Sequence, residues 1–147
     1  AGGPGVIATD LIDKNQALDF YNFSQKEKEI LKKDLPEASS VENPIDILGD
    51  ADSKRYKVCL ENLRKIKGIG GVLVLITPQA QTDVENILKE IQKKNKEFIF
   101  SIIPVLIGEK KSQIFQFPVE AISSLNQISQ YQKLSQSKKN QYPEKPF

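Results

Sequence analysis

Histidine is absent from this chain of 147 residues. Its absence removes the side chain best suited to proton transfer near neutral pH and the commonest metal ligand. It also excludes a phosphohistidine carried by the chain itself. We therefore expect no catalytic residue and no metal ligand here, and we expect any chemistry to be shared with another domain or polypeptide.

Cysteine is nearly absent. The single cysteine, Cys59, excludes an internal disulfide, and its place on an apolar helical stripe indicates a buried hydrophobic residue rather than a nucleophile. No apolar run approaches the roughly 20 residues that span a bilayer, and the sequence opens without the charged and apolar regions of a signal peptide. These features predict a soluble protein of the reducing cytoplasm, with no membrane partner.

No charge of one sign dominates. The 21 basic and 19 acidic residues are interspersed and give a formal net charge of +2, so nothing suggests a nucleic-acid partner. The dinucleotide fingerprint GxGxxG and the P-loop GxxxxGK[ST] are both missing. The length fits one domain with a core of its own.

The most informative segment that is present is the first one, Ala-Gly-Gly-Pro-Gly at 1–5. Such a turn lets backbone approach an anion, and a helix beginning at Val6 would direct its free amide groups and positive dipole end at that anion. On composition alone, phosphate contact and close packing of helix against sheet explain the glycines equally well. Such turns usually follow a β-strand, so the pattern predicts a fold whose first strand is lacking from this sequence.

Periodicity predicts alternating helices and strands. Helices are expected at 6–14, at 24–35 with Ser24 as N-cap, along a stripe from Tyr56 to Ile66, after a Thr82–Glu85 capping box, and from Pro118. Strands are expected at 17–23, 44–48, 72–76, within 98–107 and at 114–117, with Pro104 favouring an edge or a bulge. The alternation predicts an α/β fold, a flavodoxin-like parallel sheet with helices on both faces, over residues 1–132, followed by a polar tail or linker at 133–147.

Ligands of parallel sheets bind outside the carboxyl ends of the strands. Three loops, 2–5, 49–51 and 77–81, are therefore expected to converge there. Taken alone, Asn-Pro-Ile-Asp at 43–46 is more typical of a turn into a strand than of a ligand contact. A carboxylate at Asp46 within a buried strand would need backbone amides as partners.

Four segments, in this order, resemble the NDP-forming acyl-CoA synthetases. They are Ala-Gly-Gly-Pro-Gly at 1–5 with Ala-Thr-Asp at 8–10, Asn-Pro-Ile-Asp at 43–46 with Gly-Asp-Ala at 49–51, Thr-Pro-Gln-Ala at 77–80 with Thr-Asp at 82–83, and Phe-Pro at 117–118. The resemblance covers about residues 1–132. It is to the ligase-CoA domain that closes the α portion of ADP-forming acetyl-CoA synthetase, a domain related to succinyl-CoA synthetase.

The resemblance implies a reaction that interconverts acyl-CoA, ADP and phosphate with free acid, CoA and ATP through a phosphohistidine of another domain. The whole enzyme would use CoA, ADP or ATP and Mg, and this chain is expected to bind none of them by itself. The implied partners are the CoA-binding, histidine-bearing and ATP-grasp domains or subunits of the same synthetase.

The same resemblance implies roles for named residues. Backbone amides at the start of the first helix would meet the phosphohistidine, namely those of Gly2, Gly3, Gly5, Val6 and Ile7. A neighbouring loop would be formed by Thr77, Gln79 and Ala80. Four further residues would shape the loop and the interface rather than touch phosphate: Asn43, Asp46, Gly49 and Asp50.

The sequence departs from the family pattern in two places. The strand that precedes the glycine turn is missing, which predicts that a longer polypeptide was cut or that another chain supplies the strand. After Ile107, residues 108–113 are too few for the helix usual in the family. Two other functions stay open: a synthetase-like regulatory module fused to a protein acetyltransferase, and a flavodoxin-like binding module with no catalytic duty.

Overall fold

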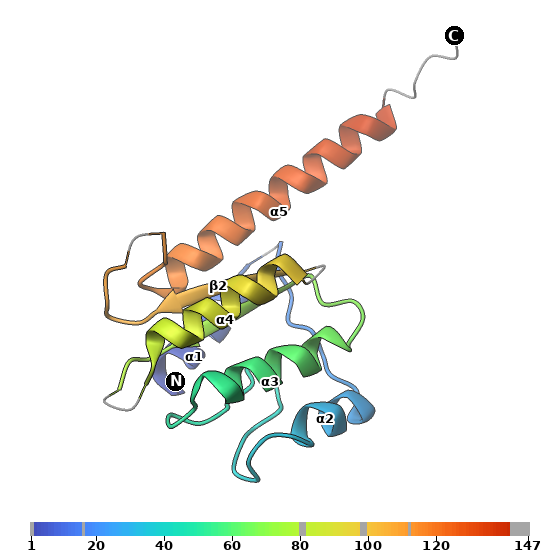
Figure 1. Cartoon of the computed structure of the whole chain (residues 1–147). Coiled ribbons are helices and arrows are strands. Elements are labelled where there is room, and N and C mark those ends of the chain that lie inside the picture. The colour runs from blue at the N-terminus through green and yellow to red at the C-terminus, as the bar shows by residue number, and fades with distance from the viewer. Residues whose placement is uncertain (1, 16, 80–81, 98–99, 112, 142–147) are drawn as a thin grey trace.

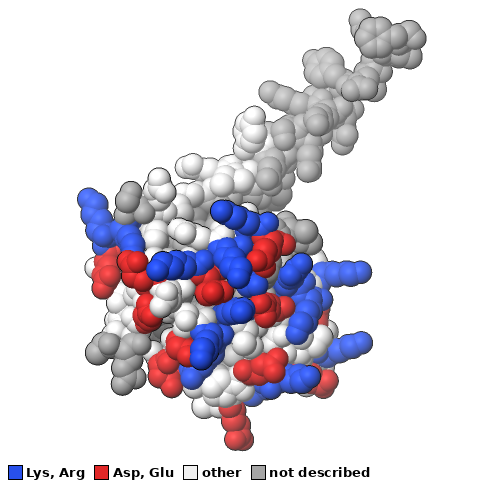
Figure 2. Space-filling model, viewed as in Figure 1, with Lys and Arg blue, Asp and Glu red and all other residues white. Residues whose placement is uncertain are grey.

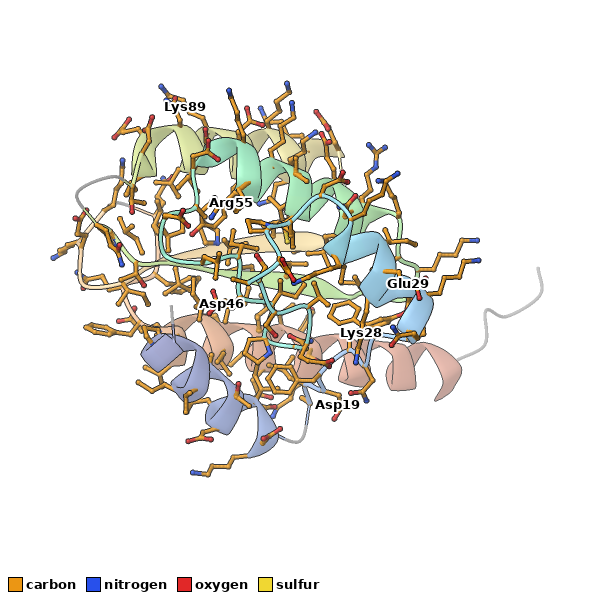
Figure 3. All side chains as sticks on the ribbon, turned by 90° about the horizontal axis from the view of Figure 1, so that it is seen from below. Asp19, Lys28, Glu29, Asp46, Arg55 and Lys89 are labelled. Atoms are coloured by element: carbon orange, nitrogen blue, oxygen red, sulfur yellow. The ribbon has the colours of Figure 1, made fainter. Side chains whose placement is uncertain are left out.

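The computed structural model describes the chain except residues 1, 16, 80–81, 98–99, 112 and 142–147, and it describes side chains only as far as Tyr131 (Figure 1). The described elements are, in order, α1 Gly2–Asp13, α2 Gln25–Lys32, α3 Ser53–Arg64, β1 Gly71–Ile76, α4 Val84–Glu97, β2 Ser101–Leu106 and α5 Pro118–Gln141. The strands lie between one layer formed by α1 and α5 and another that contains α3 and α4 (Figure 3).

The two described strands, β1 and β2, run parallel, with Gly71 opposite Ser101 and Ile76 opposite Leu106. Both are apolar along most of their length because helices cover both faces of the sheet. The predicted α/β class, with parallel strands and helices on both faces, is confirmed. Of the described helices, none is both long and apolar enough to cross a membrane.

Pro104 lies inside β2, where the sequence favours an edge. The backbone N–H of Leu106 bonds to the carbonyl of Phe115, whereas that of Ile107 bonds to the carbonyl of Ile76 in β1. Since N–H groups of a strand alternate in direction, position 104 faces away from β1, as position 106 does. The missing donor of Pro104 therefore removes no bond of the β1–β2 ladder.

The hydrophobic core fills the space between the sheet and the helices α2, α3 and α4. The predicted stripe of α3 is confirmed, since four of its five residues are buried: Cys59, Leu60, Leu63 and Ile66. They meet buried residues of the other elements, which include Leu31, Ile76, Ile87, Ile91 and Ile102. Burial raises the pKa of the Cys59 thiol to about 11, which agrees with a packing role and not with a nucleophile.

Three predicted strands are wrong as regular elements. Residues 17–23 and 44–48 are not strands, and 114–117 contributes only an isolated bridge between Phe115 and Val105. The apolar side chains of these segments still pack on the core: Tyr21, Phe23, Ile45, Ile47 and Ile114. Apolar alternation thus predicted burial, but a strand also needs a neighbouring strand to which it can bond.

Helix boundaries differ from the predictions at four places. α1 begins at Gly2 rather than Val6, so the glycines form its first turn, and α2 ends at Lys32 rather than at 35. Ser24 caps α2 with the full capping box, as predicted. For α4, Asp83 rather than Thr82 accepts the capping bond, from the N–H of Asn86 at 3.1 Å.

The fourth difference is at the end of α5, which continues to Gln141, well into the predicted polar tail or linker (Figure 1). Residues 119–141 contain neither glycine nor proline, so nothing in their backbone chemistry stops a helix. Residues 142–147 lie outside the described part.

Candidate functional site at the carboxyl edge of the sheet

A cleft of about 210 Å³ opens where β1 ends. Pro4 of α1, the loop 48–51, and Thr77, Gln79 and Thr82 after β1 contribute to its walls. The three loops that were expected to converge therefore do meet, as far as they are described. Ala80, named with them from the sequence, lies outside the described residues.

The first turn of α1 borders this cleft through Pro4. Gly2 and Gly3 belong to that turn, where backbone N–H groups have no intrahelical partner, and Pro4 has no N–H. Val6 and Ile7 lie in the next turn, where each N–H bonds to the carbonyl four residues earlier. The amides free to meet an anion are thus those of Gly2 and Gly3.

Packing requires glycine neither at position 3 nor at position 5 of α1. A Cβ atom built on Gly3 would meet nothing within 4 Å, and one on Gly5 would touch only Pro44, at 3.9 Å. A Cβ on Gly49, by contrast, would lie 3.2 Å from Nε2 of Gln79. Gly49 therefore lets two walls of the cleft approach each other, whereas Gly3 leaves open space.

The loop before α3 is held by its own side chains. The carboxylate of Asp46 accepts the N–H of Leu48 at 2.8 Å, and Leu48 adopts the left-handed conformation with φ of 71°, which is costly for a leucine. Arg55 donates to the carbonyl of Ile47 at 3.1 Å and to the carboxylate of Asp50. This hydrogen bond from Arg55 lowers the pKa of Asp50.

Asp46 itself corrects an expectation. It is exposed rather than buried in a strand. Its carboxylate meets water and one loop amide, so it needs no set of buried partners. Asp46 and Asp50 hold this loop through their hydrogen bonds to Leu48 and Arg55, and the part expected of them at an interface stays a prediction.

Three hydroxyl groups line the cleft. The hydroxyl of Thr82 accepts the N–H of Gln79 at 3.0 Å, which fixes the turn after β1. The hydroxyl oxygen of Thr77 is buried and has no hydrogen-bond partner among the described residues. Tyr56, from α3, has its pKa raised chiefly by burial. An unpaired buried hydroxyl costs about 1–3 kcal/mol.

Asn43 is not brought to this cleft. Its side chain donates to the carbonyl of Tyr21 at 3.2 Å and lines a separate cleft of about 590 Å³ near the carboxyl end of α1. Sequence reasoning missed Tyr56, Leu48 and Arg55, although Arg55 follows Asp52 at the spacing of a helix cap.

The described lining of the cleft contains no charged side chain. It offers hydroxyl and amide groups, together with the positive end of the α1 dipole. These groups suit an anionic oxygen group, such as a phosphoryl group, and they supply neither a base nor a nucleophile. The arrangement can bind and stabilise a negative charge.

This fold and this cleft define an α/β module that presents the amino end of a helix at the carboxyl edge of a parallel sheet. No family model matches the chain. The chain is 33% identical to acetate–CoA ligase [ADP-forming] I of Archaeoglobus fulgidus, over 92% of this chain and 20% of that protein. It is 29% identical to 4-hydroxybutyrate–CoA ligase [ADP-forming] of Nitrosopumilus maritimus, over 74% of this chain and 15% of that protein.

A solved structure agrees with these relatives. The dinucleotide-forming acetyl-coenzyme A synthetase 1 of Ca. Korarchaeum cryptofilum, in complex with phosphate and ADP, is similar with a TM-score of 0.65 and 26% identity, over 88% of this chain and 27% of that one. The chain belongs to the NDP-forming acyl-CoA synthetase family. It spans about a fifth of the length of the Archaeoglobus relative.

Proposed function

We propose that this chain is the ligase-CoA module of an ADP-forming acyl-CoA synthetase of the acetate–CoA ligase type, acting in the cytoplasm. In this role the chain stabilises a phosphohistidine that another domain of the synthetase carries. CoA, nucleotide and Mg bind to the other domains. We refer below to the whole enzyme that contains this chain as the complete synthetase.

The observation that carries this proposal is the open first turn of α1 at the cleft. Gly2 and Gly3 offer N–H groups without intrahelical partners. A Cβ atom at Gly3 would meet nothing within 4 Å, so there is open space beside this residue for a bound phosphoryl group. A phosphoryl group placed there would receive two N–H donors and the helix dipole. Gly5, Val6 and Ile7 contribute the helix that aligns this dipole.

The second support is the chemistry of the groups that the chain and its cleft contain. The chain contains no histidine, so it cannot carry the phosphoryl group itself. The cleft has no charged group in its described lining, and it is built from neutral donors. Preorganised donors of this kind stabilise a transferring phosphoryl group without taking part in covalent chemistry, and removing one costs about 10²–10³ in rate in comparable sites.

The neighbouring loop plays a supporting part. The buried hydroxyl of Thr77 lacks a partner, and the side chain of Gln79 lies against Gly49 across the cleft. We assign to Thr77 a hydrogen bond to a phosphoryl oxygen, because this bond would satisfy the hydroxyl. Gln79 lines the cleft beside Gly49.

The experiment compares glycine variants of the complete synthetase by the amount of labelled phosphohistidine that forms from acyl-CoA and phosphate. Gly3→Val and Gly5→Val are expected to abolish phosphoenzyme formation or its turnover and to leave CoA binding intact. Gly70→Val is the matched control, because a Cβ there also meets nothing within 4 Å and the residue precedes β1 at the opposite edge of the sheet. Unchanged phosphorylation kinetics in Gly3→Val would remove the phosphate role.

A further inference from the structure

One hydroxyl group at the cleft has no part in the proposed function, that of Tyr56. Tyr56 is the fourth residue of α3 and follows the loop 48–51, which contributes the neighbouring wall. The residue is half-buried, packs against the hydrophobic core and also lines the cleft. A tyrosine in such a position buries its apolar ring and presents its polar hydroxyl to the open side, which here is the cleft.

The hydroxyl of Tyr56 forms no hydrogen bond with the residues that the structure describes. Tyr21 provides the contrast, because its hydroxyl bonds to the carboxylate of Glu27 at 2.9 Å and to the carbonyl of Lys67 at 3.0 Å. Tyrosine hydroxyl groups usually find a hydrogen-bond partner when they are buried. A half-buried hydroxyl without such a partner is therefore available to a ligand in the cleft.

The environment of Tyr56 keeps its hydroxyl protonated. Burial is the main cause that raises the pKa of Tyr56, and Cys59 and the carboxylate of Asp46 raise it further. A protonated phenol donates a hydrogen bond, whereas a phenolate would repel an anion. Near neutral pH, the hydroxyl of Tyr56 therefore suits a negatively charged oxygen.

Charged side chains are distributed away from the cleft. Five of the twelve residues of α3 and seven of the fourteen of α4 are charged. Figure 2 shows basic and acidic side chains crowded over the face that these helices form with α2. The described lining of the cleft, by contrast, contains no charged side chain. An anion in the cleft therefore depends on neutral donors, and the hydroxyl of Tyr56 is one of them.

We propose that Tyr56 is a further catalytic residue of this site, and that its hydroxyl donates a hydrogen bond to an oxygen of the phosphoryl group. This role rests on the proposed function, because it needs a phosphoryl group in the cleft. The proton stays on Tyr56, and no covalent bond forms or breaks there. α3 then contributes a donor beside Thr77 and the first turn of α1, so donors from three separate segments hold the phosphoryl group.

Packing of the aromatic ring is the competing explanation, since Tyr56 belongs to the apolar stripe of α3. A phenylalanine would pack in the same way, but it would present no donor to the cleft. Tyr56→Phe therefore removes the proposed hydrogen bond and keeps the ring.

The test measures phosphoenzyme formation in the complete synthetase from acetyl-CoA and labelled inorganic phosphate, at saturating phosphate. We expect Tyr56→Phe to slow this step by about tenfold to a hundredfold, which is the loss expected for one hydrogen bond to a charged group. Tyr21→Phe is the matched control, because it also removes a tyrosine hydroxyl but lies at the separate cleft near the carboxyl end of α1. The control should leave the rate unchanged.

Two further measurements separate direct contact from an effect on the fold. Urea unfolding should give Tyr56→Phe the same free energy of unfolding as the parent, because the ring is kept and the hydroxyl has no partner among the described residues. The phosphorus NMR signal of the phosphohistidine should shift in Tyr56→Phe and not in Tyr21→Phe. An unchanged rate in Tyr56→Phe overturns the role of Tyr56, and so does a slower rate with an unshifted signal.

The outcome for Tyr56 can be separated from that for the phosphate role of α1. If Gly3→Val abolishes the phosphoenzyme while Tyr56→Phe leaves the rate unchanged, the proposed function stands and the role of Tyr56 fails. If Gly3→Val leaves the kinetics unchanged while Tyr56→Phe slows them and shifts the signal, Tyr56 contacts the phosphoryl group and the part proposed for α1 fails.

Discussion

Replacing Gly3 by alanine tests whether a glycine is needed at this position for ligand binding or for folding. A Cβ at this position meets nothing within 4 Å, and Gly3 lies within α1. In a helix interior, alanine is favoured over glycine by about 0.5–1 kcal/mol, which sets the upper bound for a residue of the first turn. The structure therefore predicts that Gly3→Ala stabilises α1, and that local opening of the helix becomes rarer by up to about fivefold, since 1.4 kcal/mol is a factor of ten.

The effect on phosphoryl chemistry should have the opposite sign. In a helix, each Cα–Cβ bond is tilted toward the amino end, so the new methyl group points to the side where the phosphoryl group would sit. A displacement of about 1 Å at a reacting centre costs up to about 10²-fold in rate. We expect Gly3→Ala to lower the rate of phosphoenzyme formation by about tenfold to a hundredfold.

Two assays on the same preparation measure the change in the stability of α1 and the change in the rate of phosphoenzyme formation. Hydrogen exchange of peptides from α1 reports the local stability of the helix, and rapid quench with labelled phosphate reports phosphoenzyme formation. Gly70→Ala serves as control and should leave the phosphorylation rate unchanged. The reasoning is refuted if Gly3→Ala loosens α1, or if it stabilises α1 and leaves the rate within twofold of the parent.

The remaining predictions follow from single contacts. Thr77→Val should leave the free energy of unfolding unchanged or raise it by about 1 kcal/mol, because it removes an unpaired buried hydroxyl. The same substitution should slow phosphoenzyme formation. A loss of stability with unchanged kinetics would contradict the assignment of Thr77. Lys94→Ala should lower the free energy of unfolding in urea by about 2 kcal/mol, because the aliphatic stem of Lys94 is buried, whereas Lys94→Met, which keeps most of this stem, should lower it less. Hydrogen bonds from Lys94 lower the pKa values of Glu61 and Glu97, and the same bonds raise the pKa of Lys94. The stability that this cluster contributes is therefore present between about pH 4.5 and 10.5. Urea unfolding measured across pH should show this contribution disappearing as the pH falls below or rises above that window. Cys59, whose pKa is about 11, should react with a thiol reagent at pH 8 only after unfolding, and rapid reaction of the folded chain would show that it is accessible.

Elements with a strong apolar period could be predicted from the sequence. The stripe of α3 that includes Cys59 and Leu63 determines by itself which face of the helix is buried. The apolar run at Val72–Ile76 predicts by itself a strand that is covered on both faces. The capping box at Ser24 is likewise a local signal, since all its bonds join residues three apart. Local chemistry fixes such features wherever the rest of the chain lies.

Features that depend on a distant partner could not be predicted in this way. Residues 44–48 have the composition of a strand, but no described strand pairs along their length, and only Asp46 bridges to Ser40. Thr82 looked like the cap of α4 because Glu85 follows at the right spacing, yet its hydroxyl holds the turn at Gln79, and Asp83 takes the cap instead. The first case lacks a pairing strand among the described residues, and the second is a competition between two local bonds that tertiary geometry decides.

The candidate site was predictable as a meeting of loops and not as a set of contacts. The rule that ligands bind beyond the carboxyl ends of strands brought Gly49, Thr77 and Gln79 together with the start of α1. The sequence did not indicate Tyr56 as a site residue, because its position on the α3 stripe is explained by packing alone. The left-handed conformation of Leu48 leaves no sequence signal, since glycine or asparagine is the residue expected there.

The central claim is that the first turn of α1 receives a phosphoryl group carried by another domain, and a structure of the phosphorylated complete synthetase tests it most directly. The account predicts a phosphoryl oxygen within about 3 Å of the amide nitrogen of Gly2 or Gly3, at the distance of a hydrogen bond. A phosphohistidine bound by other residues, with both of these amides facing solvent, would contradict it.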